Sequence, residues 1–399
     1  MKKPVIIAIL FLITILPVCP DITGDSNGDD RISTGELSSA ILADLETGES
    51  VSPEVMDAAF MYRYWNGTPL MITDTANRTT ILDKPVRRLI AYDGSTLETL
   101  RSLNASNLII GVPQNAHDEQ TFFPEFQNTP DVGTVWSPNI ESLLALHPDT
   151  IFIYATISQD AVKTIEDQVH NLDPSIRVLR FDLFRPEVYP AEARIIGKIL
   201  GKNQEAEEFL SFYEPVMNSI RNRVASIPEM ERKTVYFESW NAYKSAAPGS
   251  GYHEKVVFSG GRNIFADSST PYPAVDPEAV LRLAPDIIIK QVGAGEANVG
   301  GYNDPDNSAL IPVHDVLVNR TGWRTLPAVQ QNKVYIIQSD ILGSASHFIG
   351  MQYLAKWFYP DLFADCDPLK THQEYLNRFQ HLAFDPAIRG GFVYGNATC

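Results

Sequence analysis

The stretch PNIESLLALHPDTIFI at residues 138–153 has a counterpart, VDPEAVLRLAPDIII, at residues 275–289. In each copy a residue that can cap a helix precedes a glutamate, Glu141 or Glu278, and apolar side chains then recur at helical spacing. A Pro-Asp pair stops the helix and leads into an apolar run of the kind found in buried parallel strands. This repeat predicts two similar α/β lobes.

Other apolar runs fit the same two lobes as further strands. They lie at residues 88–92, 108–111, 234–237 and 334–337. Between the lobes, residues 190–227 form one long helical pattern whose only glycines are Gly197 and Gly201. This segment is too long for an ordinary loop. We expect a rigid rod that allows the lobes a small rocking motion rather than wide hinge closure.

The overall composition excludes several classes of protein. The chain has 399 residues and a net charge of −17, with 44% hydrophobic and 20% charged residues. These fractions are ordinary for a folded protein, and the acidic balance argues against a nucleic-acid partner. The sequence lacks the strand–Gly-x-Ser-x-Gly–helix setting, the phosphate loop and the His-Glu-x-x-His motif. We therefore expect no enzymatic activity.

The first 19 residues predict export. Met1-Lys2-Lys3 precedes an uncharged apolar run that ends at Val18, as in a secretory signal. The following Cys19 sits in a loose lipobox, so the N-terminus is anchored by lipid on Cys19, anchored by an uncleaved segment, or released. We expect the protein in the periplasm or on the cell surface. There, Cys366 and Cys399 either pair or remain free thiols.

An acidic module is predicted at residues 21–67. Its loop matches the calcium-loop template at positions 1, 3, 5, 7, 9 and 12, which are Asp25, Asn27, Asp29, Arg31, Ser33 and Glu36, with Arg31 offering its backbone carbonyl. Position 6 is Asp30 instead of Gly, although Asp tolerates a left-handed backbone. We expect structural Ca²⁺ here; a solvated acidic linker is the alternative. The module resembles a dockerin or single EF-hand, which implies a cohesin-like partner, but it lacks the second dockerin loop.

Further markers point to a family. Residues 260–265 (GGRNIF) and 353–363 (YLAKWFYPDLF), taken with the repeat, resemble the iron-siderophore and vitamin B12 class (class III) of periplasmic substrate-binding proteins of ABC importers. The resemblance covers about residues 70–395. It implies two Rossmann-like lobes, at residues 70–187 and 229–399, joined by a long rigid helix at residues 188–228.

The resemblance also implies a function. Such a protein captures a metal chelate (a ferric siderophore, haem or a corrinoid) in an interlobe cleft and delivers it to a permease and its ATPase. Glu141 and Glu278 match the glutamates that dock on permease arginines in this class. The structural alternative is that both only complement helix dipoles. A second functional hypothesis is a calcium-dependent cell-envelope interaction protein whose lobes no longer serve transport.

Ligands of open α/β sheets lie beyond the carboxyl ends of the strands. Loops at these ends nominate a set of mainly aromatic and polar side chains as ligand contacts: Asp93, Ser95, Trp136, Tyr154, Trp240, Tyr243, Lys244, Tyr252, His253, Tyr272 and His347. Aromatic rings suit a large flat chelate. For each ring, core or rim packing is the alternative, and for each histidine a satisfied imidazole. The loops lack an arginine cluster, which argues against a strongly anionic ferric catecholate.

Overall fold

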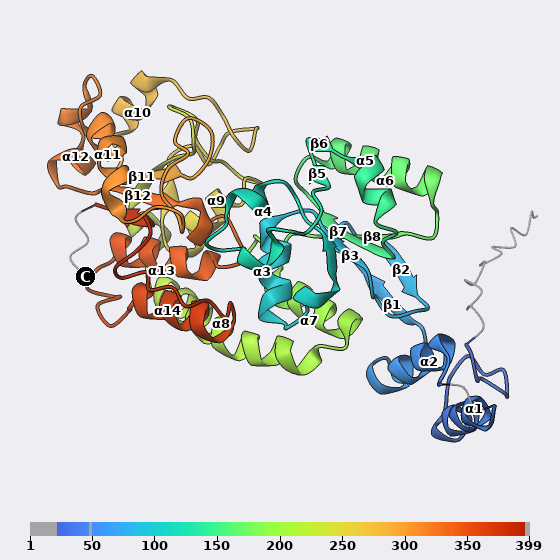
Figure 1. The fold of residues 1–399 in the computed structure, drawn as a ribbon. Helices are drawn as coiled ribbons and strands as arrows, with labels where there is room; N and C mark the ends of the chain where they lie inside the picture. The colour runs from blue at the N-terminus through green and yellow to red at the C-terminus, as the bar shows by residue number, and fades with distance from the viewer. Residues whose placement is uncertain (1–21, 48–49, 396–399) are drawn as a thin grey trace, which may run out of the picture. The chain divides into compact units, whose positions relative to one another are not determined.

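A computed structural model describes residues 22–47 and 50–395 (Figure 1). The chain divides into two compact units, one of residues 1–71 with 81–85 and the other of residues 72–80 with 86–399. Each unit is described by itself below. The predictions for the export signal, for lipid on Cys19 and for a Cys366–Cys399 pair involve residues outside the described ranges. None of the helices in the described ranges is long and apolar enough to cross a membrane.

The smaller unit contains two helices, α1 (Thr34–Glu46) and α2 (Pro53–Tyr64). Ser33 caps α1 in a capping box with Glu36, and Ser52 caps α2 ahead of Pro53. Their apolar faces pack together through a small core of Ile32, Leu37, Val55, Ala58, Met61 and Trp65. A hairpin of β1 (Leu70–Thr73) and β2 (Thr79–Leu82) follows, and the division between the two units runs through it.

The first lobe of the larger unit is built on a four-stranded parallel sheet of order β4-β3-β7-β8. The strands are β3 (Leu89–Ala91), β4 (Ile109–Gly111), β7 (Thr150–Tyr154) and β8 (Arg177–Phe181). A small second sheet pairs β5 (Gly133–Thr134) with β6 (Ser137–Pro138). The helices are α3 (Gly94–Ser102), α4 (Asn115–Asp118), α5 (Ile140–Ala145) and α6 (Gln159–Leu172), with 3-10 turns η1 (Ser106–Leu108) and η2 (Pro124–Phe126).

The second lobe has a five-stranded sheet of order β10-β9-β11-β12-β13, parallel except for β13. The strands are β9 (Thr234–Glu238), β10 (Arg262–Asn263), β11 (Ile287–Val292), β12 (Val334–Gln338) and β13 (Val393–Tyr394). The helices are α9 (Tyr252–Phe258), α10 (Pro277–Leu283), α11 (Ile311–Val318), α12 (Pro327–Gln330), α13 (His347–Phe358) and α14 (Pro368–Arg378). The 3-10 turns are η3 (Glu229–Glu231), η4 (Asn307–Leu310), η5 (Trp323–Thr325) and η6 (Ser339–Ile341).

The sequence repeat folds as predicted in both lobes: α5 leads into β7 and α10 into β11. The aspartate of each Pro-Asp pair fixes the neighbouring strand at its amino end. The Asp149 carboxylate accepts the backbone N–H groups of Arg87 and Arg88 at 2.8 and 2.9 Å. The Asp286 carboxylate accepts the N–H and the hydroxyl of Thr234, both at 2.8 Å. The prediction of two parallel-sheet α/β lobes is confirmed.

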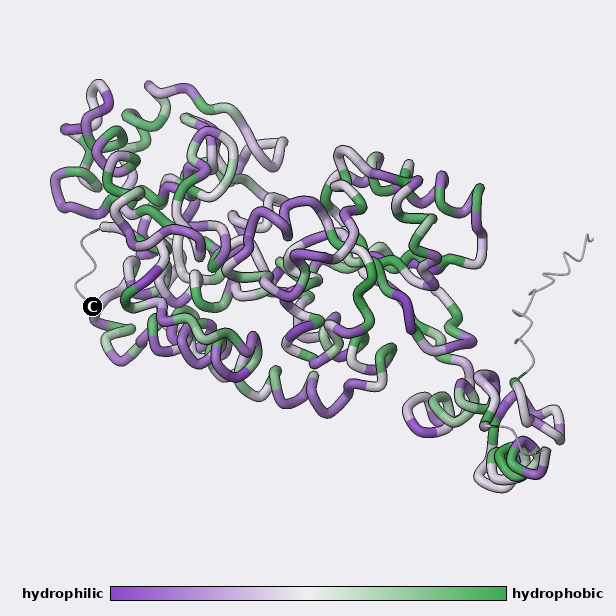
Figure 2. Tube along the Cα trace, in the orientation of Figure 1, coloured by the Kyte–Doolittle hydropathy of each residue, from purple (hydrophilic) through white to green (hydrophobic). Residues whose placement is uncertain are grey.

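The prediction of a single rod between the lobes is wrong. The connector is two helices, α7 (Tyr189–Leu200) and α8 (Asn203–Val224). Gly201 adopts a left-handed backbone (φ 67°) and ends α7, which is the usual role of glycine at this position. The helices then approach so closely that a Cβ on Gly197 would lie 2.7 Å from that of Ala206. Along α8 hydrophilic and hydrophobic residues alternate, as expected for a helix with one buried face (Figure 2).

Candidate functional site

A cavity of about 160 Å³ lies between the carboxyl edges of the two sheets. The first lobe lines it with the start of α3, the α4 region and the end of β7. The second lobe contributes the start of α9 and the segment around η6. Its lining includes the side chains of Ser95, Glu98, Glu119, Tyr154, Tyr252 and Asp340.

A second cavity of about 470 Å³ adjoins the first and shares Asn115, Glu119 and Asp340 with it. Its other walls include Asp118 and Asp304 and the glycine-rich loop after β11. We call the two cavities together the interlobe cleft.

The lobes also contact each other directly at the cleft. The ring of Phe122 stacks on that of Tyr302, with centroids 4.3 Å apart. Asn303 donates to the Asp118 carbonyl at 2.8 Å and accepts the Thr121 N–H at 3.2 Å. Residues of the two lobes therefore touch each other across the cleft.

Three carboxyl groups converge on the cleft from both lobes. Glu98 accepts hydrogen bonds from the Tyr375 hydroxyl at 2.8 Å and the Ala345 N–H at 2.9 Å, both in the second lobe. Burial, followed by repulsion from Glu98, raises the pKa of Asp340 from 3.8 to about 7. Burial and repulsion from Asp340 and Glu98 raise the pKa of Glu119 well above its usual value. Desolvation and mutual repulsion thus disfavour the ionised form of these carboxyl groups.

The carboxyl groups of the cleft do not form a cage for a bare metal ion. Within the residues that the structure describes, no group of three or more His, Cys, Asp or Glu side chains is arranged to hold one. The cleft instead combines carboxyl groups with the rings of Phe122, Phe123, Tyr154 and Tyr252. Such a lining suits an organic ligand or a chelate.

Of the predicted ligand contacts, the structure brings Ser95, Tyr154 and Tyr252 to the cleft. Tyr252 stacks on Phe237, with centroids 5.3 Å apart, and its hydroxyl accepts the Gln291 amide at 3.0 Å. Asp93 lies behind the wall, where it caps α3 by accepting the Thr96 N–H at 2.9 Å. Burial raises the pKa of Asp93 to about 6.

Three other predicted contacts form a separate stack in the second lobe. The rings of Trp240 and Tyr272 lie 5.0 Å apart, and the Lys244 ammonium lies 5.0 Å from the Trp240 ring. The Tyr272 hydroxyl donates to the Ser250 carbonyl at 2.8 Å. None of the three lines the interlobe cleft as the structure describes it.

The remaining predicted contacts do not line the two cavities of the cleft. Trp136 is 67% exposed on the β5–β6 turn, where its indole donates to Ser158. Tyr243 packs beneath the Arg320 guanidinium, 4.4 Å from the ring. His253 hydrogen-bonds Asn263 within its own lobe.

His347 is a satisfied histidine, as in the alternative weighed for it, but it is buried in the core rather than at the surface. Its Nε2 accepts the Tyr213 hydroxyl at 2.7 Å and its Nδ1–H donates to the Ser344 carbonyl at 2.9 Å. Burial lowers the pKa of His347 well below its usual value, so the ring is neutral.

The analysis of the sequence missed Glu98, Glu119 and Asp340. Asp340 lies just after β12, so the rule that ligands gather beyond strand ends would have reached it. Glu119 follows β4 at a longer distance. Glu98 lies inside α3, where a glutamate normally indicates a solvated face, and no local signal marks it as buried.

The two predicted docking glutamates are exposed in the first turns of α5 and α10. Asn139 and Asp276 already cap these helices through their own side chains, so neither glutamate is needed as a cap. No ion pair to Glu141 or Glu278 forms within the described part of the chain. Figure 1 shows α5 and α10 on the same side of the larger unit, one in each lobe.

The predicted calcium loop is folded back on itself. Asp30, at position 6, takes the left-handed backbone that the template requires there (φ 60°), and its N–H donates to Asp25 at 2.9 Å. The Glu36 carboxylate accepts the N–H groups of Ser26, Asn27 and Ser33 at 3.0–3.2 Å. Hydrogen bonds from Ser33 and then Ser26 outweigh the slight desolvation and lower the pKa of Glu36 to about 2.

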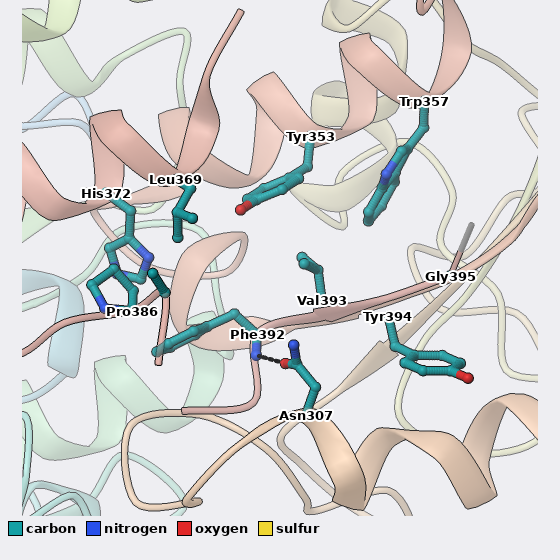
Figure 3. Close-up of a pocket in the computed structure, with 11 residues that line it drawn as sticks. Asn307, Tyr353, Trp357, Leu369, His372, Pro386, Phe392, Val393, Tyr394 and Gly395 are labelled. Atoms are coloured by element: carbon teal, nitrogen blue, oxygen red, sulfur yellow. Dashed lines mark hydrogen bonds between the residues drawn. The ribbon is translucent and has the colours of Figure 1, made fainter. Parts of the chain in front are cut away.

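A further pocket, of about 260 Å³, lies within the second lobe and shares no lining residue with the cleft (Figure 3). Its walls include the rings of Tyr353, Trp357, His372 and Phe392. Burial lowers the pKa of His372 to about 3, so this ring is neutral, and none of the described residues that line the pocket carries a charge.

Comparisons with known proteins agree with this geometry. The model of the periplasmic binding protein family matches residues 89–341. Molybdate-binding protein MolA of Haemophilus influenzae is 23% identical over 79% of this chain and 92% of its own length. A cobalamin-binding protein of Halobacterium salinarum is 24% identical over 68% of this chain and 70% of its own. The crystal structure of the TroA-like periplasmic binding protein FepB of Veillonella parvula matches with a TM-score of 0.69 and 25% identity, covering 82% of this chain and 99% of that chain.

Proposed function

Because this chain belongs to the periplasmic binding protein family, we propose that it captures a metal chelate in the interlobe cleft and delivers it to an ABC permease. The family is a non-enzymatic component of transport and acts outside the cytoplasm. The observation that carries the proposal is the cavity between two duplicated lobes, lined by Tyr154 from one lobe and Tyr252 from the other.

The chemistry of the walls supports a chelate rather than a bare ion. Aromatic rings give a large contact area at a low entropy cost, and a few polar groups fix orientation. The relatives named above bind cobalamin or molybdate, which bounds the class of cargo without identifying it.

A direct titration tests the proposal. We expect one chelate to bind saturably per chain when cobalamin, haem and ferric siderophores are added and tryptophan fluorescence is followed. Native mass spectrometry of protein purified from its source would show the retained cargo. A folded sample that binds none of them, yet captures a cohesin-like protein in the presence of calcium, would favour the envelope interaction protein instead.

We further propose that Glu141 and Glu278 dock on basic side chains of the permease. Both are exposed, unpaired within the described residues and on the same side of the larger unit. Charged groups on an interface chiefly steer and orient the partner. Replacing both by alanine should lower uptake in reconstituted vesicles and leave chelate affinity unchanged. The matched control replaces Glu208 and Glu231, which are also exposed, and should leave both unchanged.

Calcium binding by residues 25–36 remains a proposal for the smaller unit. The supporting observation is the left-handed backbone of Asp30, because it lets Asp25, Asn27 and Asp29 share one turn. Calcium should raise the thermal midpoint of this unit in calorimetry, and Glu36→Ala should abolish the shift while Glu54→Ala preserves it. Identical traces with calcium and with a chelator would contradict the proposal.

A further inference from the structure

The interlobe cleft is rich in carboxyl groups and is lined by no basic side chain among the described residues. Five of its lining side chains are acidic, and none of those lining residues is Lys, Arg or His. The acidic side chains are Glu98, Asp118, Glu119, Asp304 and Asp340. Mutual repulsion already raises the pKa values of Glu119 and Asp340, and an anionic guest would add to that repulsion, so the lining opposes it.

These carboxyl groups differ in how far the protein already satisfies them. Both oxygens of Glu98 accept hydrogen bonds, from Tyr375 and from the Ala345 backbone. Asp340 receives hydrogen bonds from the Tyr302 backbone and the Gln338 side chain. For Glu119, the described residues supply neither a hydrogen bond nor an ion pair to the carboxylate. Asp304 accepts the Gly300 N–H at 2.7 Å. Asp118 likewise receives no hydrogen bond or ion pair within the described residues, but it is exposed, so Glu119 is the less solvated of the two carboxyl groups that can still accept a donor.

Two cations lie near the cleft, Arg101 and Lys255. The charge of Arg101 lowers the pKa values of Glu98 and Glu119, but burial outweighs it. Arg101 pairs with Glu125 at 2.8 Å and lies against the rings of Phe122 and Phe123. Lys255 is 1% exposed, and its amine lies 5.0 Å from the Tyr252 ring. Burial lowers the pKa of Lys255 to about 7, so its amine is a weak source of positive charge at neutral pH. Neither side chain lines the cleft.

We propose that the cleft selects a chelate of zero or positive net charge that presents N–H donors, and that Glu119 and Asp340 are the carboxylates that recognise it. This inference rests on the proposed function and narrows its cargo. A donor or positive centre between the two groups relieves their repulsion and forms charge-assisted hydrogen bonds. An oxyanion, or a chelate with free carboxylates, adds to the repulsion instead.

The test compares chelates of different charge on the full-length protein at pH 7. The cationic probe is ferrioxamine B, the neutral probes are ferrichrome and cyanocobalamin, and the anionic probes are ferric citrate and molybdate. We expect at least one cationic or neutral probe to bind about 100-fold more tightly than either anion. Preferential binding of ferric citrate would overturn the inference and leave the proposed function standing, whereas preferential binding of molybdate, which is not a chelate, would count against both. Binding of no probe by folded protein would count against both.

Substitutions test the two residues. Glu119→Gln and Asp340→Asn keep the shape and remove the charge, and each should weaken binding of the preferred probe about tenfold if it is cationic and severalfold if it is neutral. Glu278→Gln is the matched control and should bind like the wild type. Calorimetric unfolding would verify that the variants are folded. Unchanged affinity in the folded double variant would remove both residues from recognition.

Discussion

Two carboxyl groups at the carboxyl edge of the same five-stranded sheet have pKa values that are shifted in opposite directions. Glu238 ends β9 and is 0% exposed; Asp340 follows β12 at the interlobe cleft. Burial raises the pKa of Glu238, but the hydrogen bonds and charges of Arg320 and Lys290 outweigh burial and lower it overall. For Asp340, burial and the repulsion of Glu98 act in the same direction and raise the pKa to about 7.

The comparison shows that the partner, rather than burial alone, decides whether a carboxyl group in this sheet is ionised. Arg320 contacts both oxygens of Glu238, at 2.6 and 2.9 Å, and Lys290 lies 3.1 Å away. Among the described residues, no cation acts on Asp340 in this way. In the proposed recognition, the cargo supplies the positive charge or the hydrogen-bond donors for Asp340.

The largest expected effect comes from removing the charge of Glu238, which pairs with Arg320 and Lys290. Glu238→Gln leaves Lys290 and Arg320 as uncompensated charges in the interior, and removing one partner of a buried ion pair costs about 3–5 kcal/mol. Urea unfolding followed by circular dichroism should show this loss. Glu231→Gln, at an exposed position, should change the unfolding free energy by less than about 0.5 kcal/mol. Equal stability of the two variants would mean that the three groups near β9 are not a buried ion cluster.

Asp340, which has no cationic partner among the described residues, gives a smaller effect of opposite sign, because replacing it should raise the free energy of unfolding. The pKa of Asp340 is raised from 3.8 to about 7, so the favourable contribution of its protonated form is complete below about pH 4 and is lost as the pH rises to about 7. Asp340→Asn removes this dependence. Relative to wild type, the variant should gain about 3 kcal/mol of unfolding free energy between pH 4.5 and pH 8. Parallel pH profiles for the two proteins would show that Asp340 is ordinarily solvated.

The smallest effect is expected for Glu36, an exposed carboxylate whose pKa is lowered by hydrogen-bond donors instead of by a cation. Donors from Ser33 and Ser26 lower the pKa of Glu36 to about 2, so the associated stability is present above about pH 4.5 and is lost as the pH falls through about 2. An NMR titration should show Glu36 still ionised at pH 3. Ser33→Ala should raise this pKa toward its ordinary value. A Glu36 pKa above 4 in the wild type would mean that the loop does not close on this side chain.

The sequence predicted the lobes well because their signals are local and occur twice. Each Pro-Asp pair follows a capped helix and precedes a buried strand, and each copy supports the other. The connector was predicted as one helix because Gly201 looks the same in a helix interior and at a helix end. Only its left-handed backbone, which depends on packing between α7 and α8, distinguishes the two.

The candidate site was predicted only in part. The rule that ligands gather beyond the carboxyl ends of strands identified Ser95, Tyr154 and Tyr252, which lie at the ends of their strands or helices. It also nominated Tyr243 and His347, whose true partners, Arg320 and Tyr213, are distant in sequence. Glu98 was missed for the same reason, since Tyr375 and Ala345 become its neighbours only when the lobes meet.

The strand clamps made by Asp149 and Asp286 have a consequence for redesign. Both act at the amino ends of the sheets, on the backbone of Arg87, Arg88 and Thr234, while the cleft is built from segments at the opposite ends. Segments that contact cargo can therefore be exchanged or retargeted without disturbing these anchors. The scaffold is suited to grafting new specificities, in a biosensor for example, because its rigidity and its selectivity reside at opposite edges.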